Sequence, residues 1–219
     1  MTHAERVQRF EAADLYVVIT GEFCGGRSPL SVLDSVLAAG VTLVQCREKH
    51  LDDGPYFDLV RQFRARTASA GALLIVDDRL DIALAANADG VHLGQRDLPV
   101  AAARGLAPEL LIGASTHSLE QAHAAERDGA SYVNIGPIFA TQTKTKTAAP
   151  LGPEAISQIA PRIHIPFSCM GGIKLENIDS VVSRGARHPA VVTAVTAAQD
   201  PEAAARAMRE RILAGASAS

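Results

Sequence analysis

The chain has 219 residues, of which 47% are hydrophobic, and a formal net charge of -3. Only 4% of residues are aromatic and no basic block is present, which argues against a dedicated nucleic-acid-binding protein. No apolar run approaches the ~18 residues of a membrane span, and residues 1–10 are too polar for a signal peptide. Cys24, Cys46 and Cys169 lack metal-ligand spacing and an even count, as expected of reduced thiols in a cytoplasmic protein.

Apolar, β-branched runs alternate with stretches of helical periodicity along the chain. The runs lack strict polar alternation, which is typical of buried parallel strands. We expect strands at residues 15–20, 43–47, 73–76, 90–93, 111–114, 132–135, 167–170 and 190–195. We expect helices at residues 30–39, 56–70, 79–86, 100–106, 119–128, 153–159, 177–184 and 201–213. Glycines just past four of these helices predict left-handed C-caps at Gly40, Gly71, Gly129 and Gly185.

Eight such units in a chain of this length predict an α/β fold, a single (β/α)8 TIM barrel. An open, doubly wound sheet is the alternative. We expect residues 1–219 to form one barrel domain, with residues 1–14 as an N-terminal helical extension. Active sites of such barrels lie at the carboxyl ends of the strands. The polar residues that follow each predicted strand are therefore the candidate site.

The second predicted strand runs into Gln45-Cys46-Arg47-Glu48-Lys49. Alternation along a strand directs Gln45 and Arg47 to one face and Cys46 to the other. The basic side chains suit a phosphate. A solvated loop explains Arg47, Glu48 and Lys49 equally well when they are considered without their neighbours.

Carboxylates follow the next two predicted strands, with Asp77 and Asp78 after the third and Asp97 after the fourth. Magnesium favours carboxylates combined with substrate phosphates over an all-protein cage. The first hypothesis is therefore an enzyme that acts on a diphosphate ester. The alternative is that these residues cap the following helices. His92, within the fourth strand, is expected to be a hydrogen-bonded structural histidine.

The later strand ends carry hydroxyls, lysines and glycines. The candidates are Ser115 after the fifth strand, the loop 136–147 after the sixth, Gly171 and Gly172 after the seventh, and Val192 and Thr193 in the eighth. Threonines and lysines suit phosphate oxygens, and glycines let a backbone approach an anion. Loops after the last two strands form the phosphate site that recurs in this fold. A simple turn hydroxyl and a flexible surface loop are the alternatives for Ser115 and for the loop 136–147.

Several segments together resemble one known family. They are Gln45-Cys46-Arg47-Glu48-Lys49, Asp78-Arg79, Gly90-Val91-His92-Leu93-Gly94-Gln95-Arg96-Asp97-Leu98, Ile112-Gly113-Ala114-Ser115, Gly136-Pro137, Thr141-Gln142-Thr143-Lys144 and Gly171-Gly172-Ile173. In this order they resemble the thiamine phosphate synthase family, also called thiamine-phosphate pyrophosphorylase. The resemblance implies a (β/α)8 barrel that joins a hydroxymethylpyrimidine diphosphate to a thiazole phosphate and releases diphosphate.

The resemblance also implies roles for individual residues. Asp78 and Asp97 would hold the cofactor, Mg²⁺. The pyrimidine diphosphate would bind Gln45, Cys46, Arg47, Glu48, Lys49, Asp77, Ser115 and Lys144, and the thiazole phosphate Thr141, Gln142, Thr143, Gly172, Val192 and Thr193. Arg47, Lys49, Ser115 and Lys144 would be catalytic. The expected partners are these two small molecules, without nucleic acid or membrane, and a homo-oligomer is compatible with the sequence.

Two departures from the family pattern stand out. Asp77 occupies a position where the family usually has asparagine, and Arg187-His188, followed by Pro189, replaces a common Asp-Gly. An asparagine amide both donates and accepts hydrogen bonds, whereas an ionised aspartate only accepts. Asp77 is thus expected to accept from the exocyclic amine of the pyrimidine.

Two rival functions can be weighed on the same residues. A related barrel that isomerises the thiazole phosphate could lose the metal ligands and residues 45–49. A non-catalytic ligand-binding regulator need not keep both Asp78 and Asp97. Both features are present here, which favours the synthase.

Overall fold

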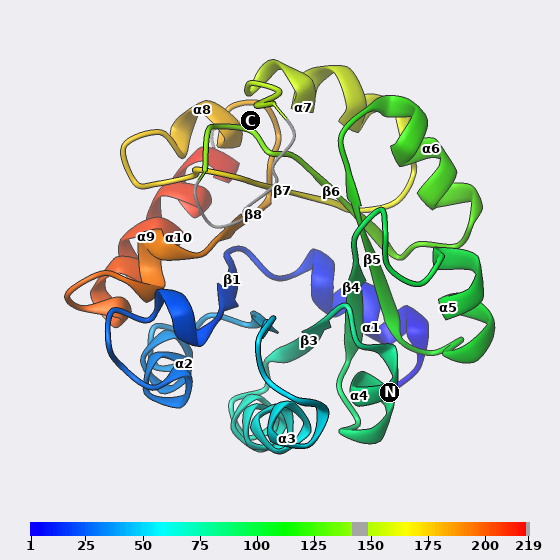
Figure 1. Ribbon diagram of the computed structural model, residues 1–219. Coiled ribbons are helices and arrows are strands. Elements are labelled where there is room, and N and C mark those ends of the chain that lie inside the picture. Colours follow the sequence, from blue (N-terminus) through cyan, green and yellow to red (C-terminus); the bar gives the residue numbers. More distant parts are fainter. Residues whose placement is uncertain (142–148, 218–219) are drawn as a thin grey trace.

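The computed structural model describes residues 1–141 and 149–217. Eight parallel strands close into a barrel in sequence order, with helices around it (Figure 1). The strands are β1 (Tyr16–Ile19), β2 (Leu43–Cys46), β3 (Leu73–Asp77), β4 (Gly90–Leu93), β5 (Leu111–Thr116), β6 (Tyr132–Ile135), β7 (Phe167–Met170) and β8 (His188–Val191). The (β/α)8 prediction is confirmed, and the open sheet is wrong, because β1 pairs with both β2 and β8.

Helical segments precede the first strand, connect the strands and follow the last one. They are α1 (His3–Glu11), η1 (Gly21–Phe23), α2 (Pro29–Ala38), α3 (Asp53–Ser69), α4 (Leu80–Ala85), α5 (Val100–Leu106), α6 (Leu119–Arg127), α7 (Glu154–Ile159), η2 (Ala160–Arg162), α8 (Asp179–Val182), α9 (Thr193–Thr196) and α10 (Pro201–Ser217). The four predicted C-cap glycines all have positive φ angles, between 67° and 91°. Among the described residues, no helix is long and apolar enough to cross a membrane.

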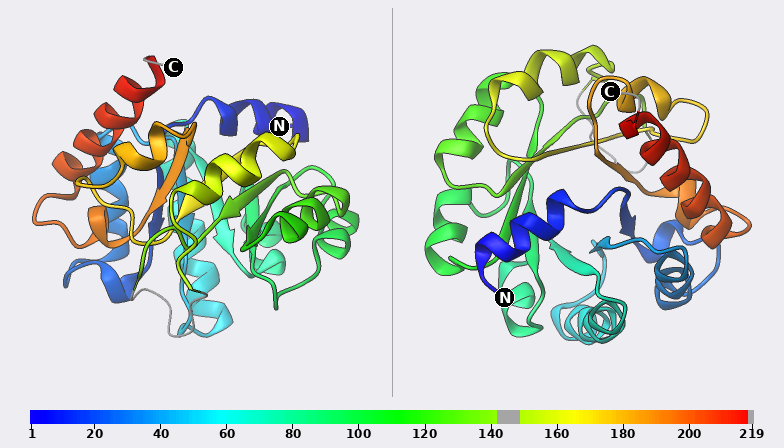
Figure 2. Two further views of the ribbon diagram at one scale, coloured as in Figure 1. Left: turned by 90° about the horizontal axis from the view of Figure 1, so that it is seen from above. Right: turned by 180° about the vertical axis from the view of Figure 1, so that it is seen from behind.

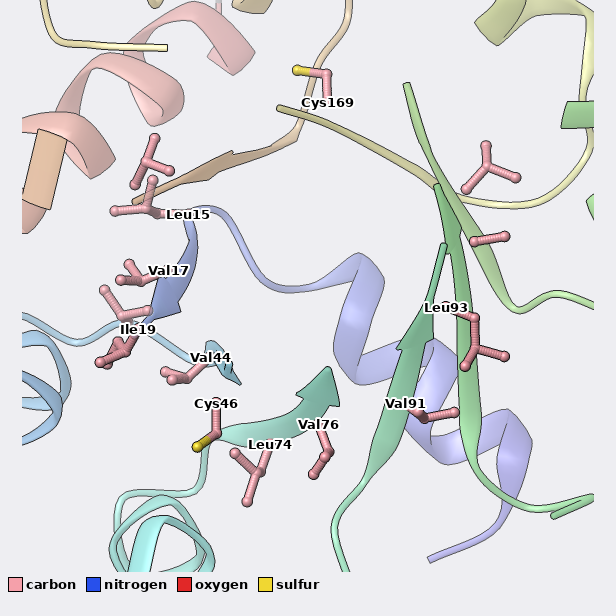
Figure 3. Close-up of a cluster of buried hydrophobic side chains, with 14 of the residues drawn as sticks. Leu15, Val17, Ile19, Val44, Cys46, Leu74, Val76, Val91, Leu93 and Cys169 are labelled. Carbon is pink, nitrogen blue, oxygen red and sulfur yellow. The ribbon is translucent and has the colours of Figure 1, made fainter. Parts of the chain in front are cut away.

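The strand side chains alternate between two apolar cores. Outward-facing residues such as Val17, Val44 and Leu74 pack between the strands and the helices (Figure 3). Inward-facing residues, among them Val18 and Ile75, form a smaller core inside the barrel. This alternation leaves one side-chain position in two to face the barrel axis, and these positions line any site at the barrel mouth.

Helix α1 covers the amino ends of the strands. It lies across the barrel opening in the view from behind (Figure 2, right). Phe10 of this helix is 1% exposed and stacks on Tyr132 inside the barrel, with ring centroids 4.3 Å apart. His188, at the start of β8, donates from Nδ1 to the Ala13 carbonyl over 2.8 Å. Because this end is closed, a ligand must enter from the carboxyl ends of the strands.

The last strand corrects the prediction for residues 190–195. β8 starts at His188 and ends at Val191, so that Pro189 lies within it, and Thr193 begins the helix α9. A short apolar run does not by itself distinguish strand from helix. Pairing with β1, which matches Tyr16 to Ala190, sets the register instead. The other predicted boundaries shift by a few residues, the usual variation at element ends.

Candidate active site

A pocket opens at the carboxyl ends of the strands. It is lined by Val18 of β1, Gln45 of β2, Arg47 just beyond it, Asp77 of β3, His92 of β4, Met170 of β7 and Val192 after β8. All strands of a parallel barrel end on the same side, so residues far apart in sequence meet there. The structure thereby brings Gln45, Arg47 and Asp77 together, as predicted from the strand ends.

Three carboxylates gather beside this pocket. Asp77 is 8% exposed, and its Oδ2 lies 2.6 Å from Lys49 Nζ and 3.5 Å from Arg47 Nε. Lys49 also bonds to Asp78, whose carboxyl group lies in contact with that of Asp97. Asp97 is anchored by the Gly94 amide, which donates to Oδ2 over 2.6 Å. Lys49 therefore bonds directly to Asp77 and Asp78, and Asp97 contacts Asp78.

Burial and the mutual repulsion of the carboxylates shift the pKa values of this cluster. Burial raises the pKa of Asp77, and the charge of Asp78 adds to the rise. Burial also raises the pKa of Asp97 and outweighs the opposing Gly94 amide, with Asp78 adding to the rise. For Asp78, burial acts in the same direction, but the hydrogen bond and charge of Lys49 prevail and lower the pKa. A further cation near Asp78 and Asp97 would relieve this repulsion.

The helix-capping alternative is wrong for these carboxylates. The N-cap positions of α4 and α5 are Arg79 and Pro99, and neither has a side-chain capping bond. Asp78 instead adopts the left-handed region, with φ of 60°, which is uncommon outside glycine. Its amide donates to the His92 carbonyl over 2.9 Å, which holds the strained turn against β4. Strain of this kind clusters at functional sites.

Asp78 and Asp97 fit the predicted magnesium ion as a pair. Within residues 1–141 and 149–217, no group of three or more His, Cys, Asp or Glu side chains forms a protein-only cage. Magnesium commonly binds one or two carboxylates, with substrate phosphates and water completing its shell. Two carboxylates in mutual contact at the mouth of a pocket match that pattern.

Two residues predicted to contact the substrate have side chains with other partners in the structure. Cys46 is 1% exposed and its side chain packs outward in the core against the helices (Figure 3), as alternation requires. Burial raises the pKa of its thiol well above the usual range. Glu48 Oε1 accepts a hydrogen bond from the Gly21 amide over 2.6 Å. These two side chains stabilise the loop after β2, while Gln45 and Arg47 supply the pocket.

The loops after β6 and β7 are joined through their backbones. The amides of Ile138 and Phe139 donate to the carbonyls of Met170 and Gly171 over 2.8 and 2.9 Å. Gly172 has φ of 62°, and a Cβ atom there would lie 2.4 Å from the Ala140 carbonyl oxygen, so only glycine fits. Thr141 is described, whereas Gln142, Thr143 and Lys144 lie outside the described residues.

The loop after β8 brings the last predicted residues to the same end of the barrel. Val192 is half-buried in the pocket lining, and the exposed Thr193 starts α9. A short helix after the eighth strand often contributes to the phosphate site of this fold.

Hydrogen bonds connect five polar side chains, two of which, Gln45 and His92, line the pocket. Gln45 Nε2 donates to Tyr16 OH over 2.6 Å, and Tyr16 OH lies 3.1 Å from Tyr132 OH. His92 Nδ1 lies 3.1 Å from Tyr132 OH, and its Nε2 2.9 Å from Ser115 Oγ. The prediction of a hydrogen-bonded His92 is confirmed. The tyrosines were not predicted, although a tyrosine on an inward-facing strand position signals a polar group that needs a partner.

Comparison with known proteins agrees with this geometry. The family model described as thiamine monophosphate synthase (TMP-TENI) matches residues 15–195. The chain is 46% identical over 195 residues to a thiamine-phosphate synthase of Chloroflexus aurantiacus, covering 89% of this chain and 90% of the relative. It is 48% identical over 192 residues to a thiamine-phosphate synthase of Chlorobium luteolum, covering 87% and 89%.

Solved structures show the same relationship. A thiamine phosphate pyrophosphorylase from Pyrococcus furiosus superposes with a TM-score of 0.87 at 33% identity, covering 95% of this chain and 98% of that one. A 3-hexulose-6-phosphate synthase, at 21% identity and a TM-score of 0.66, shares the fold. From the family match and the identities to its relatives, the chain belongs to the thiamine monophosphate synthase family.

Proposed function

We propose that this chain is a thiamine-phosphate synthase, a transferase that joins hydroxymethylpyrimidine diphosphate to thiazole phosphate and releases diphosphate. The family membership supports the reaction. The observation that carries the proposal is the contact between Asp78 and Asp97 beside Lys49, at the mouth of a pocket that Arg47 also lines. Such a site suits a diphosphate that is bound with a cation and leaves with its charge neutralised.

The chemistry is a dissociative substitution at the methylene carbon of the pyrimidine. The C–O bond to diphosphate breaks with both electrons on oxygen, and the thiazole nitrogen then forms the new C–N bond. Arg47 and Lys49 neutralise charge on the departing diphosphate, and the aminopyrimidine ring delocalises the positive charge left behind. The protein mainly positions the two substrates, which is a large effect for a bimolecular reaction.

Magnesium is the proposed cofactor. Asp78 and Asp97 would hold it, and when bound it would add positive charge next to the diphosphate. Lys49 bonds to Asp78 and to the neighbouring Asp77, and so positions Asp78 for this role. We assign the pyrimidine diphosphate to the side of the pocket lined by Gln45 and Arg47, with Ser115 reached through its contact with the pocket-lining His92. The thiazole phosphate is assigned to the loops with Gly172, Val192 and Thr193.

The setting proposed for this reaction is the cytoplasm. The three cysteines are buried and unpaired, which suits a reducing compartment. We also propose that residues 1–219 act as one barrel domain on these two small molecules.

A product-formation assay with a magnesium titration tests the function. The purified chain, the two substrates and Mg²⁺ should yield thiamine phosphate and diphosphate, and chelation should stop the reaction. Isomerisation of the thiazole phosphate without coupling would support a tautomerase-like barrel. Binding of either phosphate compound without any turnover at saturating Mg²⁺ would support a non-catalytic regulator.

A further inference from the structure

The five hydrogen-bonded side chains form one continuous path across the barrel. It runs from Gln45 on β2 through Tyr16 on β1 and Tyr132 on β6 to His92 on β4 and Ser115 on β5. All five are buried, with at most 7% exposure. The bonds therefore form in a low-dielectric interior, where an unsatisfied polar group is costly and bonds strengthen one another.

The number of available protons restricts how this path can be arranged. Burial raises the pKa of both Tyr16 and Tyr132, so each phenol keeps its single proton at neutral pH. A neutral imidazole also carries one proton. The four hydrogen bonds must then all run in the same donor-to-acceptor direction, from one end of the path to the other. A reversal midway would leave a buried hydroxyl proton with no acceptor within the path.

The Gln45 amide sets that direction. With Gln45 Nε2 as the donor to Tyr16, the proton count requires that Tyr16 donate to Tyr132 and that Tyr132 donate to His92 Nδ1, two contacts whose distances fit either direction. The His92 proton then lies on Nε2 and is donated to Ser115 Oγ. Two groups remain for a ligand: the Gln45 carbonyl oxygen as an acceptor and the Ser115 hydroxyl as a donor.

We propose that Tyr16, Tyr132 and His92 are positioning residues that hold Gln45 as an acceptor and Ser115 as a donor, and so select an amino-substituted pyrimidine over its oxo form. This inference rests on the proposed function. The amine of the pyrimidine donates and a ring nitrogen accepts, which matches the two ends of the path. An oxo analogue presents a carbonyl where the amine should be, and that carbonyl would face the Gln45 oxygen.

The Asp77 carboxylate also favours a pyrimidine that donates a hydrogen bond. It lines the pocket with Gln45 and accepts only. An amine has two protons, so Gln45 and Asp77 can each accept one. Without the path, the Gln45 amide could rotate by half a turn and present its NH₂ group to an oxo compound instead.

The test measures selectivity between the amino substrate and its oxo analogue, both as diphosphates, by the ratio of kcat/KM values. Wild type should favour the amino form by about tenfold or more, because a mismatched buried hydrogen bond is costly. Tyr16→Phe and Tyr132→Phe should reduce this ratio about tenfold and raise KM for the pyrimidine diphosphate. KM for the thiazole phosphate should stay unchanged in both variants.

Tyr56→Phe is the matched control. Its side chain is also buried, but its hydroxyl donates to the backbone carbonyls of Cys46 over 2.9 Å and of Asp77 over 3.4 Å and takes no part in the path. This variant should keep the wild-type ratio. Equal ratios in wild type, Tyr16→Phe and Tyr132→Phe would overturn the proposal, as would an equal loss of selectivity in Tyr56→Phe.

An activity-independent measurement separates this inference from the proposed function. Imidazole ¹⁵N NMR of the ligand-free full chain, with His92→Gln to assign the signal, reports which ring nitrogen carries the proton. We expect the Nε2–H tautomer of His92 in wild type and an altered Nδ1 shift in Tyr132→Phe. A proton on Nδ1 in wild type would overturn the path even if the enzyme is active. A chain with the expected tautomer but no turnover would instead refute the proposed function.

Discussion

The acidic side chains at the two ends of the barrel differ in how their negative charge is balanced. At the amino ends of the strands, Asp14 is met by Arg209, with Nε 2.9 Å and Nη2 2.9 Å from Oδ2. Asp89 at the same end is met by Arg64 over 2.7 Å and by the Leu74 amide over 2.9 Å. At the carboxyl ends, three carboxylates crowd around Lys49, and the pKa values of two of them are raised.

The difference separates groups that stabilise the fold from groups that serve a ligand. A buried carboxylate paired with an arginine has its charge compensated in the folded protein itself. Asp77 and Asp97, whose pKa values are raised by burial and by the neighbouring Asp78, lower the stability of the folded protein when they ionise, and a bound cation would offset that cost. Stability is commonly given up at functional sites in this way. Substitutions at the two ends should therefore have opposite consequences.

The largest effect is expected from Asp78→Asn and Asp97→Asn at the mouth. Each should reduce kcat by roughly 10²–10³-fold, because charge on the departing diphosphate loses its stabilisation. Asparagine also tolerates the left-handed backbone of Asp78. Tm should not fall in Asp97→Asn, because the pKa of Asp97 is raised in the folded protein. Asp34→Asn, at an exposed carboxylate on α2 paired with Arg66, is the control. Near-wild-type activity of both mouth variants at limiting Mg²⁺ would disprove the metal assignment.

Asp14→Asn, at the closed end of the barrel, should lower stability and leave kcat unchanged. Removing this carboxylate leaves Arg209 half-buried without its partner, at a cost of about 1–3 kcal/mol in the free energy of unfolding. Because the residue lies far from the pocket, kcat of the folded protein should be unchanged. Urea unfolding and steady-state kinetics on the same preparation give both values. A large loss of kcat with unchanged stability would contradict the division between the two ends.

Substitutions on different loops of the carboxyl end should have smaller effects, each chiefly on KM for one of the two substrates. Arg47→Ala and Lys144→Ala should raise KM for the pyrimidine diphosphate by roughly tenfold, the scale of one charge-assisted hydrogen bond. Thr193→Val should raise KM chiefly for the thiazole phosphate, since it lies on the separate loop after β8. Varying each substrate in turn measures the two constants. Equal effects of all three changes on both KM values would rule out the partition.

The smallest effect is expected from Asp77→Asn. Activity should persist, with weaker dependence on Mg²⁺ concentration, because one negative charge next to the metal ligands is removed. Since burial raises the folded-state pKa of Asp77, its ionisation destabilises the protein. The variant should therefore gain on the order of 1 kcal/mol, or ~2–4 °C in Tm, at neutral pH.

The stability advantage of this variant should depend on pH. The folded state holds the Asp77 proton more tightly than the unfolded state, so wild-type stability falls as pH rises from the unfolded pKa through the raised folded pKa. The advantage of Asp77→Asn should be complete above that window and vanish below it. Thermal unfolding of both proteins from pH 3 to pH 8 measures this. An advantage that grows as pH falls would show that the Asp77 charge is stabilising. Activity gained only in the asparagine form would show that Asp77 disables the site.

Local patterns in the sequence determined the outline of the fold and part of the site. The alternation of apolar runs and helical periods predicted eight units, and the positions of Asp78 and Asp97 after neighbouring strands placed them side by side. Alternation within β2 separated Gln45 from Cys46. These inferences succeed because side-chain direction in a strand and the common polarity of parallel strands are local properties.

Closure of the barrel decided the rest. Tyr16 meets Tyr132 only because β1 and β6 face each other across the interior, and Glu48 meets the Gly21 amide only after β1 and β2 pair. The end of β8 at Val191 depends likewise on its register against β1. No local pattern specifies contacts between residues so distant in sequence, because their distance is set by strand tilt and register once the sheet closes on itself.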